Sequence, residues 1–242
     1  MTYQAVFQRY EIKYLITRTQ KDLILRGMEP HMVLDEYGRT VIRNIYFDTA
    51  DYRLVRRSIE RPVFKEKLRI RSYGQAAPES TVFVELKRKY RGTVYKRRLP
   101  LCEERAMQWT RGVCPCPSDT QISREIDYFL SCYGTLRPTV FLSCEREAYR
   151  SLNGGSFRVT FDDTVLCRET DLSLGADVYG APLLEDGQVL MEIKCAGGIP
   201  LWMTGVLSRE RIYKTSFSKY GAAYQKLIWP GLNINKECAL YA

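Results

Sequence analysis

The sequence has very little histidine, no zinc-type cysteine spacing and no nucleotide-binding loop. Its single histidine, His31, excludes metal sites that need several histidines and argues against a histidine-based catalytic triad. The eight cysteines include no C-x-x-C pair, so neither a zinc site nor a disulfide framework is indicated. The absence of a Gly-Lys pair excludes a P-loop, and there is no kinase-type Gly-rich loop. Any catalysis must use lysines, arginines, carboxylates or a metal ion.

Long apolar runs are also missing. The first residues, MTYQAVFQRYEIKY, contain no apolar stretch that could act as a secretory signal. No stretch reaches the ~18 apolar residues that a membrane-spanning helix needs. We therefore expect no membrane span in this chain and a cytoplasmic location.

Positive charge is abundant instead. The chain has 37 lysines and arginines against 28 acidic residues, which gives a net charge of +9. Such an excess attracts polyanions, whether nucleic acid, an anionic membrane or phosphorylated small molecules. The arrangement of the charges must decide between these partners.

Several segments alternate strictly between apolar and charged residues, which is the pattern of a strand with two unlike faces. In residues 64–73, Lys65, Lys67, Arg69 and Arg71 share one face while the other face is apolar. Similar alternation occurs at 9–14, 82–90, 157–163 and 189–195, and further strands are predicted at 41–48, 94–99 and 139–149.

Helical stretches lie between the strands. The first opens with a T-x-x-Q capping box at Thr17 and Gln20. Helices are predicted at 17–31, 49–60, 102–111, 119–133, 202–211 and 216–228. The chain shows no repeat, low-complexity tract or linker. We therefore predict one α+β domain over residues 1–242, with 230–242 as a peripheral tail.

A charged face on a single strand usually meets solvent. Here the charged faces mix arginines with isolated acids, while the opposite faces are apolar on strand after strand. An antiparallel sheet closed on itself, apolar outside beneath helices and charged inside, reconciles both patterns. An interior of unpaired cations would be severely destabilising unless water or a polyanion occupied it. The predicted fold is a closed, eight-stranded antiparallel β-tunnel with a charged interior and flanking helices.

Eight short motifs follow one another along the chain. They are RYEIKY (9–14), IYFDT (45–49), KLRIRSY (67–73), VELKRK (84–89), CEREAY (144–149), RVTFDD (158–163), MEIK (191–194) and SFSKY (216–220). In this order they resemble the triphosphate tunnel metalloenzymes, or CYTH superfamily, over residues 5–229. Within it they look like the polyphosphate polymerase domain of the vacuolar transporter chaperone (VTC) type. The superfamily's E-x-E-x-K hallmark reads R-x-E-x-K here, because Arg9 replaces the first acid, and this fits the polymerase branch better than the hydrolases.

The resemblance implies a tunnel that holds a triphosphate chain. Guanidinium groups suit this task because they are planar, bidentate donors that keep their charge. The implied substrate-binding residues are Arg69, Arg71, Lys87, Lys96, Arg98, Arg146, Arg158, Lys194 and Ser218. The implied catalytic residues are Lys219, Lys13 and Arg146.

The resemblance also implies a Mn²⁺ or Mg²⁺ cofactor. Such an ion takes one or two carboxylates together with phosphate oxygens. Glu192 matches the family's metal carboxylate, with Glu11 and Glu85 as further candidates that could instead orient a neighbouring cation. Asp162 could orient Arg158 in the same way.

The SFSKY motif is expected to begin a helix, with Ser216 as its N-cap and Lys219 in its first turn. A lysine near the positive end of a helix and near other cations should have a lowered pKa. That would suit a nucleophile or proton shuttle, although the pattern favours a plain phosphate-contacting lysine over covalent catalysis.

Three functions remain open at this point. The first is a polymerase that transfers the γ-phosphate of ATP onto inorganic polyphosphate, with phosphate or pyrophosphate as further small ligands and no specific nucleic acid. The second is a hydrolase of tripolyphosphate or a nucleoside triphosphate on the same fold. The third is a module that binds polyphosphate or RNA without turnover. The Arg9 substitution and the SFSKY motif favour the first.

Overall fold

Long antiparallel strands dominate the computed structural model of the chain, which describes residues 6–232, with side chains described from residue 10 onward. The strands are β1 (Val6–Thr17), β2 (Met32–Asp48), β3 (Phe64–Tyr73), β4 (Thr81–Tyr90), β5 (Thr93–Cys102), β6 (Arg137–Ser151), β7 (Arg158–Arg168), β8 (Ala181–Pro182) and β9 (Gln188–Cys195). The helices are α1 (Arg18–Met28), α2 (Arg53–Ile59), α3 (Glu103–Thr110), α4 (Gln121–Tyr133), α5 (Leu201–Arg209) and α6 (Lys219–Ala223), and a π-helical turn, Tyr224–Ile228, continues α6. No helix in this described part is long and apolar enough to span a bilayer.

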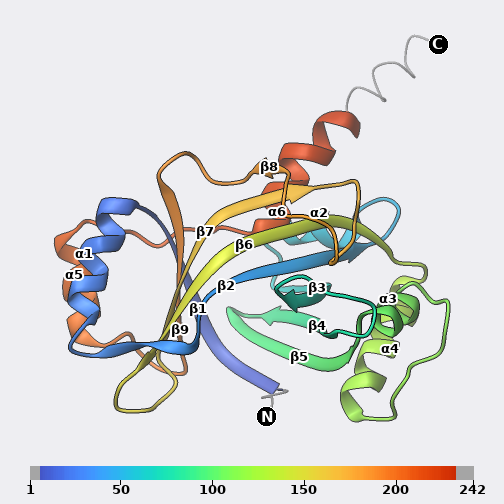
Figure 1. Cartoon of the computed structure of the whole chain (residues 1–242), viewed down its shortest axis with the longest axis horizontal. Coiled ribbons are helices and arrows are strands. Elements are labelled where there is room, and N and C mark those ends of the chain that lie inside the picture. Colours follow the sequence, from blue (N-terminus) through green and yellow to red (C-terminus); the bar gives the residue numbers. More distant parts are fainter. Residues whose placement is uncertain (1–5, 233–242) are drawn as a thin grey trace.

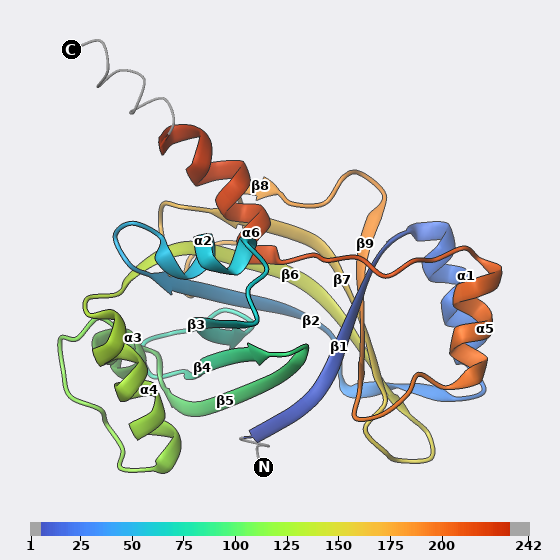
Figure 2. The same ribbon diagram turned by 180° about the vertical axis from the view of Figure 1, so that it is seen from behind.

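The strands form one antiparallel sheet with the order β6-β2-β3-β4-β5-β1-β9-β7-β8. A further pairing joins β6, at one end of that order, to β7, the strand next to the other end. Figures 1 and 2 show the strands wrapped around a common interior, with α1, α3, α4 and α5 outside them. The predicted antiparallel sheet with flanking helices is therefore confirmed.

The sheet nevertheless departs from the predicted closed, eight-stranded tunnel in two ways. It has nine strands within residues 6–232, because β8 pairs with Leu166 and Cys167 of β7 beyond the end of β9. The two edges of β1 pair with their neighbouring strands over different stretches. Val6–Arg9 pair with β5, and Tyr10–Thr17 pair with β9. At each level of β1 only one edge pairs with another strand of the sheet, so the sheet is not closed there and the prediction of full closure is wrong.

Three apolar clusters lie between the sheet and its helices. The helices α3 and α4 pack Trp109 and Phe129 against the outer faces of β3 and β4. The helices α1 and α5 lie side by side at one end of the molecule and cover β1, β7 and β9 (Figures 1 and 2). This packing explains why alternate positions on these strands are apolar, as the sequence predicted.

The third cluster changes the expected picture of the interior. Tyr220 of α6 packs among Ile42, Tyr46, Leu142 and other apolar residues of β2 and β6. Asn44, between Ile42 and Tyr46 on the same face of β2, lines a charged cavity. One end of the inner face is therefore apolar and covered by α6, and only the remaining part is charged.

Most predicted elements occur close to their expected positions. The capping box at Thr17 and Gln20 is present at the start of α1. The strand predicted at 41–48 is much longer, because β2 begins at Met32, and β8 was not predicted at all. The predicted tail, 230–242, falls largely outside the described residues, which end at 232.

Candidate functional site

A cavity of about 380 Å³ lies on the charged inner face of the sheet. Its wall combines alternate residues of β1, β2, β3, β4, β5, β6 and β9 with the irregular segment 214–218 and the start of α6. The charged lining residues are Glu11, Lys13, Lys65, Lys67, Arg69, Arg71, Lys87, Lys89, Lys96, Arg146, Glu192, Lys194, Lys214 and Lys219. Twelve of these fourteen side chains are cationic, so the cavity is suited to an anion of high charge.

A buried carboxylate holds the cations of β3 and β5 together. The Glu85 side chain is fully buried and does not line the cavity. Its Oε2 accepts hydrogen bonds from Arg69 at 2.7 and 2.9 Å, while its Oε1 accepts from Arg98 and lies 2.7 Å from Lys96 Nζ. Burial alone would raise the pKa of Glu85, but Lys96, Arg71 and the other cations lower it well below its usual value. Glu85 is therefore an ionised counter-ion that fixes its neighbours.

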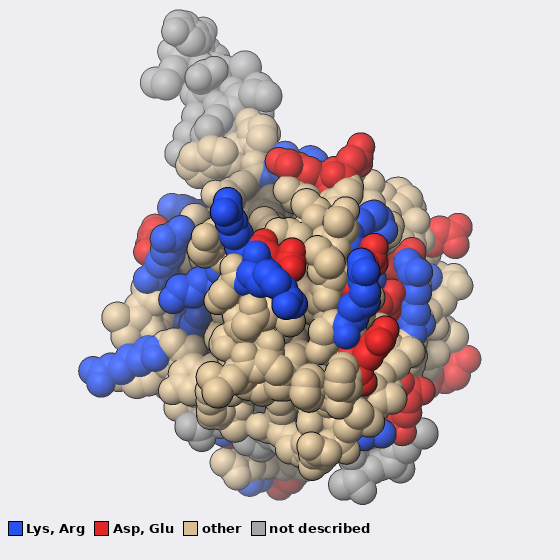
Figure 3. Space-filling view, turned by 90° about the vertical axis from the view of Figure 1, so that its left-hand side faces the viewer, with Lys and Arg blue, Asp and Glu red and all other residues tan. Residues whose placement is uncertain are grey.

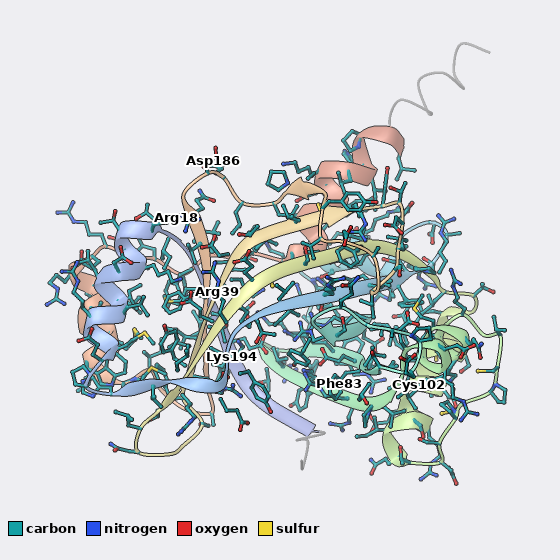
Figure 4. All side chains as sticks on the ribbon, in the orientation of Figure 1. Arg18, Arg39, Phe83, Cys102, Asp186 and Lys194 are labelled. Atoms are coloured by element: carbon teal, nitrogen blue, oxygen red, sulfur yellow. The ribbon has the colours of Figure 1, made fainter. Side chains whose placement is uncertain are left out.

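A second cluster surrounds Glu192 on β9. Its carboxylate lies 3.3 Å from Lys13, 3.2 Å from Lys194, 3.6 Å from Lys219 and 3.7 Å from Arg146. Burial would raise the pKa of Glu192, but these cations lower it well below its usual value. In Figure 4, Lys194 lies on β9 near β1, far from Phe83 and Cys102 at the opposite end of the sheet. Burial lowers the pKa of Lys194 to about 7, against the opposing effect of Glu192.

Asp162 lies beside this cluster and binds two of its cations. Its carboxylate is fully buried and accepts hydrogen bonds from Arg146 and Lys219. The expectation that Asp162 orients Arg158 is therefore wrong. The expected fall in the pKa of Lys219 is also wrong, because burial lowers it but Asp162 and Glu192 together raise it. Lys219 is held as a charged ammonium group.

Glu11 and Glu192 are the two carboxylates that line the cavity. They sit on paired positions of β1 and β9, where Glu11 is opposite Lys194 and Glu192 is opposite Lys13. Burial would raise the pKa of Glu11, but the charges of Lys87 and Lys194 and the hydrogen bond that Lys87 donates together lower it to about 2. Ionised carboxylates that reach one cavity from neighbouring strands fit the oxygen-ligand chemistry of Mg²⁺ or Mn²⁺. Glu85 does not fit this role, because it is fully buried and does not line the cavity.

The segment from 214 to 218 crosses the cavity between α5 and α6, and we refer to it as the strap. Its backbone pairs with β1 through a hydrogen bond from Thr215 N–H to Lys13 O, of 2.7 Å. Lys13 Nζ donates to Phe217 O at 2.9 Å, and Lys67 Nζ donates to Ser218 Oγ at 2.7 Å. The same Ser218 hydroxyl accepts from Gly221 N–H, so Ser218 is the N-cap of α6 and the prediction of Ser216 is wrong. The strap is thus held by cations of the cavity itself.

The structure brings most of the predicted site residues to one cavity, but not all of them. Arg98 lies behind the wall, bound to Glu85 and to the hydroxyl of Tyr73. Arg158 also lies outside the lining, because its guanidinium is bound to Asp35 of β2 at 2.8 Å. The side chain of Arg9 lies outside the described residues.

Other lining residues had no predicted role. Lys65 and Lys67 line the cavity beside Arg69 and Arg71, and Lys89 does so beside Lys87. The sequence could have indicated this position for each of them, because each lies on the same alternating charged face as a residue that was predicted to bind substrate. Tyr46 gave no such signal; it lies in the apolar stretch of β2, and its hydroxyl accepts from Arg69 at 2.8 Å.

Charged side chains are distributed differently on the outer surface than in the cavity. On the face formed by α1 and α5, basic and acidic side chains lie interspersed over a largely uncharged surface (Figure 3). Ion pairs such as Lys21 with Glu147 and Arg18 with Asp163 occur outside the cavity. On this face, the excess positive charge does not gather in one external patch.

Comparisons with known proteins agree with this architecture. A protein from Bacillus halodurans proposed to be an adenylate cyclase has a crystal structure with a TM-score of 0.58 and 15% identity, covering 93% of this chain and 100% of that one. A proposed adenylyl cyclase from Hippeastrum, described as having a dominant triphosphatase activity, has a TM-score of 0.54 and 18% identity over 90% of this chain and 95% of that one. A search of curated protein sequences found no match. The family model described as the VTC domain matches residues 8–228. The chain therefore belongs to the VTC domain family.

Proposed function

We propose that this protein is a polyphosphate polymerase that transfers the γ-phosphate of ATP onto the end of an inorganic polyphosphate chain inside the cavity. The observation that carries the proposal is the cavity wall, where rows of lysines and arginines face one space and four carboxylates hold many of them in place. Phosphoryl transfer depends mainly on such positioning and charge neutralisation. Membership of the VTC domain family supports the same function.

The reaction breaks the bond between the γ-phosphorus and the oxygen that ADP retains. It forms a new bond between that phosphorus and a terminal oxygen of the polyphosphate chain. Arg69 and Arg71, oriented by Glu85 and Asn44, hold non-bridging phosphate oxygens. Lys219 and Arg146 approach from another side of the cavity, and together these cations neutralise donor and acceptor phosphates.

Glu11 and Glu192 are the residues that would hold a divalent cation. Bound there, Mg²⁺ or Mn²⁺ would add positive charge to the phosphoryl oxygens and share its remaining coordination positions with them. The lysines that now contact these carboxylates, Lys87 and Lys13, would then be available to phosphate. The carboxylates therefore serve both to assemble the cavity and to bind the metal.

A triphosphatase is the second candidate, because the Hippeastrum protein of the same fold is described as having that activity. The two functions differ only in what attacks the γ-phosphorus, which is water in the hydrolase and a phosphate oxygen in the polymerase. A hydrolase needs no cations on the acceptor side beyond those that bind its triphosphate. The large number of cations around this cavity favours the polymerase.

The test is to incubate the purified protein with ATP and Mn²⁺ and to separate the products on a gel that resolves polyphosphate. A ladder of polyphosphate with matching release of ADP is the expected result. Release of free phosphate from ATP without polymer, at every metal and phosphate concentration tried, would replace the polymerase with the triphosphatase. Absence of both products, together with tight binding of polyphosphate, would favour the non-catalytic binding module.

A further inference from the structure

Lys219 enters the cavity from the first turn of α6, which directly follows the irregular strap. The first four N–H groups of a helix lack partners within it, so helix ends tend to fray. The strap itself is held by the side chains of Lys13 and Lys67, two cations that a phosphate chain in the cavity would also engage. An anchor that keeps Lys219 in place when substrate is bound must therefore lie elsewhere.

Tyr220, the residue after Lys219, makes such an anchor. Its side chain is buried, and its hydroxyl donates to Asp48 Oδ2 at 2.8 Å and lies 2.9 Å from Thr139 Oγ1. Burial and the charge of Asp48 raise the pKa of Tyr220 well above its usual value, so the phenol keeps the proton that it donates. The ring also stacks on Tyr46, with 4.7 Å between the ring centroids.

Asp48 is itself firmly held. It is the last residue of β2 and is fully buried, and its carboxyl oxygens accept from the N–H groups of Thr49, Leu54 and Val55 at 2.8–2.9 Å. The N-cap residue of α2, Tyr52, makes no side-chain cap, so Asp48 caps this helix in its place. Because α6 packs beside α2, the bond from Tyr220 joins the start of α6 to both β2 and α2 (Figures 1 and 2).

The first turn of α6 is thus held between two buried carboxyl groups. Tyr220 reaches Asp48 on one side, and Lys219 reaches Asp162 on the other. Successive residues of a helix point about 100° apart, so fixing the direction of one side chain fixes the rotation of the helix and the direction of the next. Asp48 does not line the cavity, so phosphate in the cavity would not compete for its bond with Tyr220.

We propose that Asp48 and Tyr220 are positioning residues, whose hydrogen bond keeps Lys219 in place beside the transferred phosphoryl group. This inference rests on the proposed function, in which Lys219 neutralises charge on the donor and acceptor phosphates. The Tyr220 hydroxyl is directed at Asp48 and acts only through Lys219. The bond maintains the direction of Lys219 when phosphate recruits Lys13 and Lys67 away from the strap.

Acetylation of lysines, located by mass spectrometry, tests the positioning without turnover. Tyr220→Phe removes the hydroxyl and keeps the ring that stacks on Tyr46. Lys219, whose side chain is 11% exposed and paired with Asp162, should react slowly in the wild-type protein. In Tyr220→Phe it should react roughly three- to tenfold faster, which is the effect of losing one hydrogen bond. Lys96, which is paired with Glu85 in the same cavity, should keep its rate.

Tyr133→Phe is the matched control. Tyr133 also donates its hydroxyl to a carboxylate, Glu66 at 3.1 Å, but it lies at the end of α4 and does not line the cavity. This variant should change neither the acetylation of Lys219 nor that of Lys96.

Release of ADP from ATP provides the second measurement. Tyr220→Phe should slow it roughly three- to tenfold, and the double variant with Lys219→Ala should be no slower than Lys219→Ala alone, because the hydroxyl acts through that lysine. Slowing by the same factor with and without Lys219 would overturn the positioning role.

The acetylation rates also separate positioning from stability. An unchanged rate at Lys219 in Tyr220→Phe would overturn the proposal. An equal rise at Lys219 and Lys96 would overturn it as well, since the hydroxyl would then only stabilise the fold. A wild-type protein that releases no ADP would remove the proposed function, while the rate at Lys219 would still decide whether the bond to Asp48 holds this lysine in place.

Discussion

Replacing the buried carboxylate of Glu85 by an amide is the most direct test of how this cavity is assembled. The Glu85→Gln variant keeps the shape of the side chain but removes the negative charge shared by Arg69, Arg71, Lys96 and Arg98. Four cations would then face one another without a counter-ion in a buried place. Breaking a buried ion pair by removing one partner costs about 3–5 kcal/mol.

For a domain of this size that cost corresponds to a fall in Tm of roughly 6–20 °C. Tripolyphosphate should restore more stability to Glu85→Gln than to the wild-type protein, because its charge replaces the missing one and it binds only the folded state. The assay is urea-induced unfolding with and without tripolyphosphate. Glu79→Gln, at an exposed position, is the matched control and should behave as the wild-type protein does.

The reasoning would be refuted if Glu85→Gln lost less than about 1 kcal/mol, which is the value expected of an exposed ion pair. Equal stabilisation of variant and wild type by tripolyphosphate would also contradict it. If instead the variant were stable but had lost metal-dependent activity alone, Glu85 would be a metal ligand and not a counter-ion.

Three further predictions follow, two about the reaction and one about how stability depends on pH. Glu192→Gln should abolish turnover of ATP in the presence of Mn²⁺ while retaining most of the tripolyphosphate affinity measured by calorimetry; full turnover at limiting metal would remove Glu192 from the metal site. Lys219→Ala should slow polymer synthesis roughly ten- to hundredfold, because one charge-assisted contact contributes about 1.5–3 kcal/mol. Its effect on ATP affinity should be smaller, and Lys219→Arg should recover part of the rate. The pKa of Glu11 falls from an ordinary value of 4.5 to about 2 on folding. Its contribution to stability is therefore complete above pH 4.5 and is lost as the pH falls towards 2, which urea unfolding across that window would measure; a stability that stays constant there would contradict the assigned ion pairs.

The sequence predicted the inner and outer faces of the strands well, for a simple physical reason. Alternation has a period of two residues, so any strand with a charged face and an apolar face reveals both. That signal predicted a shared cavity for Arg69, Arg71, Lys87 and Lys194, and all four line the cavity of the structure. It failed at Arg158, which has the right periodicity but is bound by Asp35, next to the irregular register of β2.

Contacts between distant parts of the chain were harder to predict. The ion pairs of Asp162 with Arg146 and Lys219 depend on the packing of α6 against the sheet, which no local pattern reveals. For the same reason the pKa of Lys219 was predicted to move in the wrong direction. The strap has neither helical nor strand periodicity, so its place across the cavity could not be predicted.

The contacts of β1 with the strap and with the neighbourhood of α6 affect when the cavity can form during folding. Lys13 near the start of the chain and Lys219 near its end both contact Glu192, and Lys13 also holds the strap. The cavity can therefore be completed only after every residue from 13 to 219 has been synthesised. Contacts so distant in sequence favour slow folding. Until then Glu192 and Asp162 lack Lys219 as a partner, so the charged face of the sheet is incompletely paired.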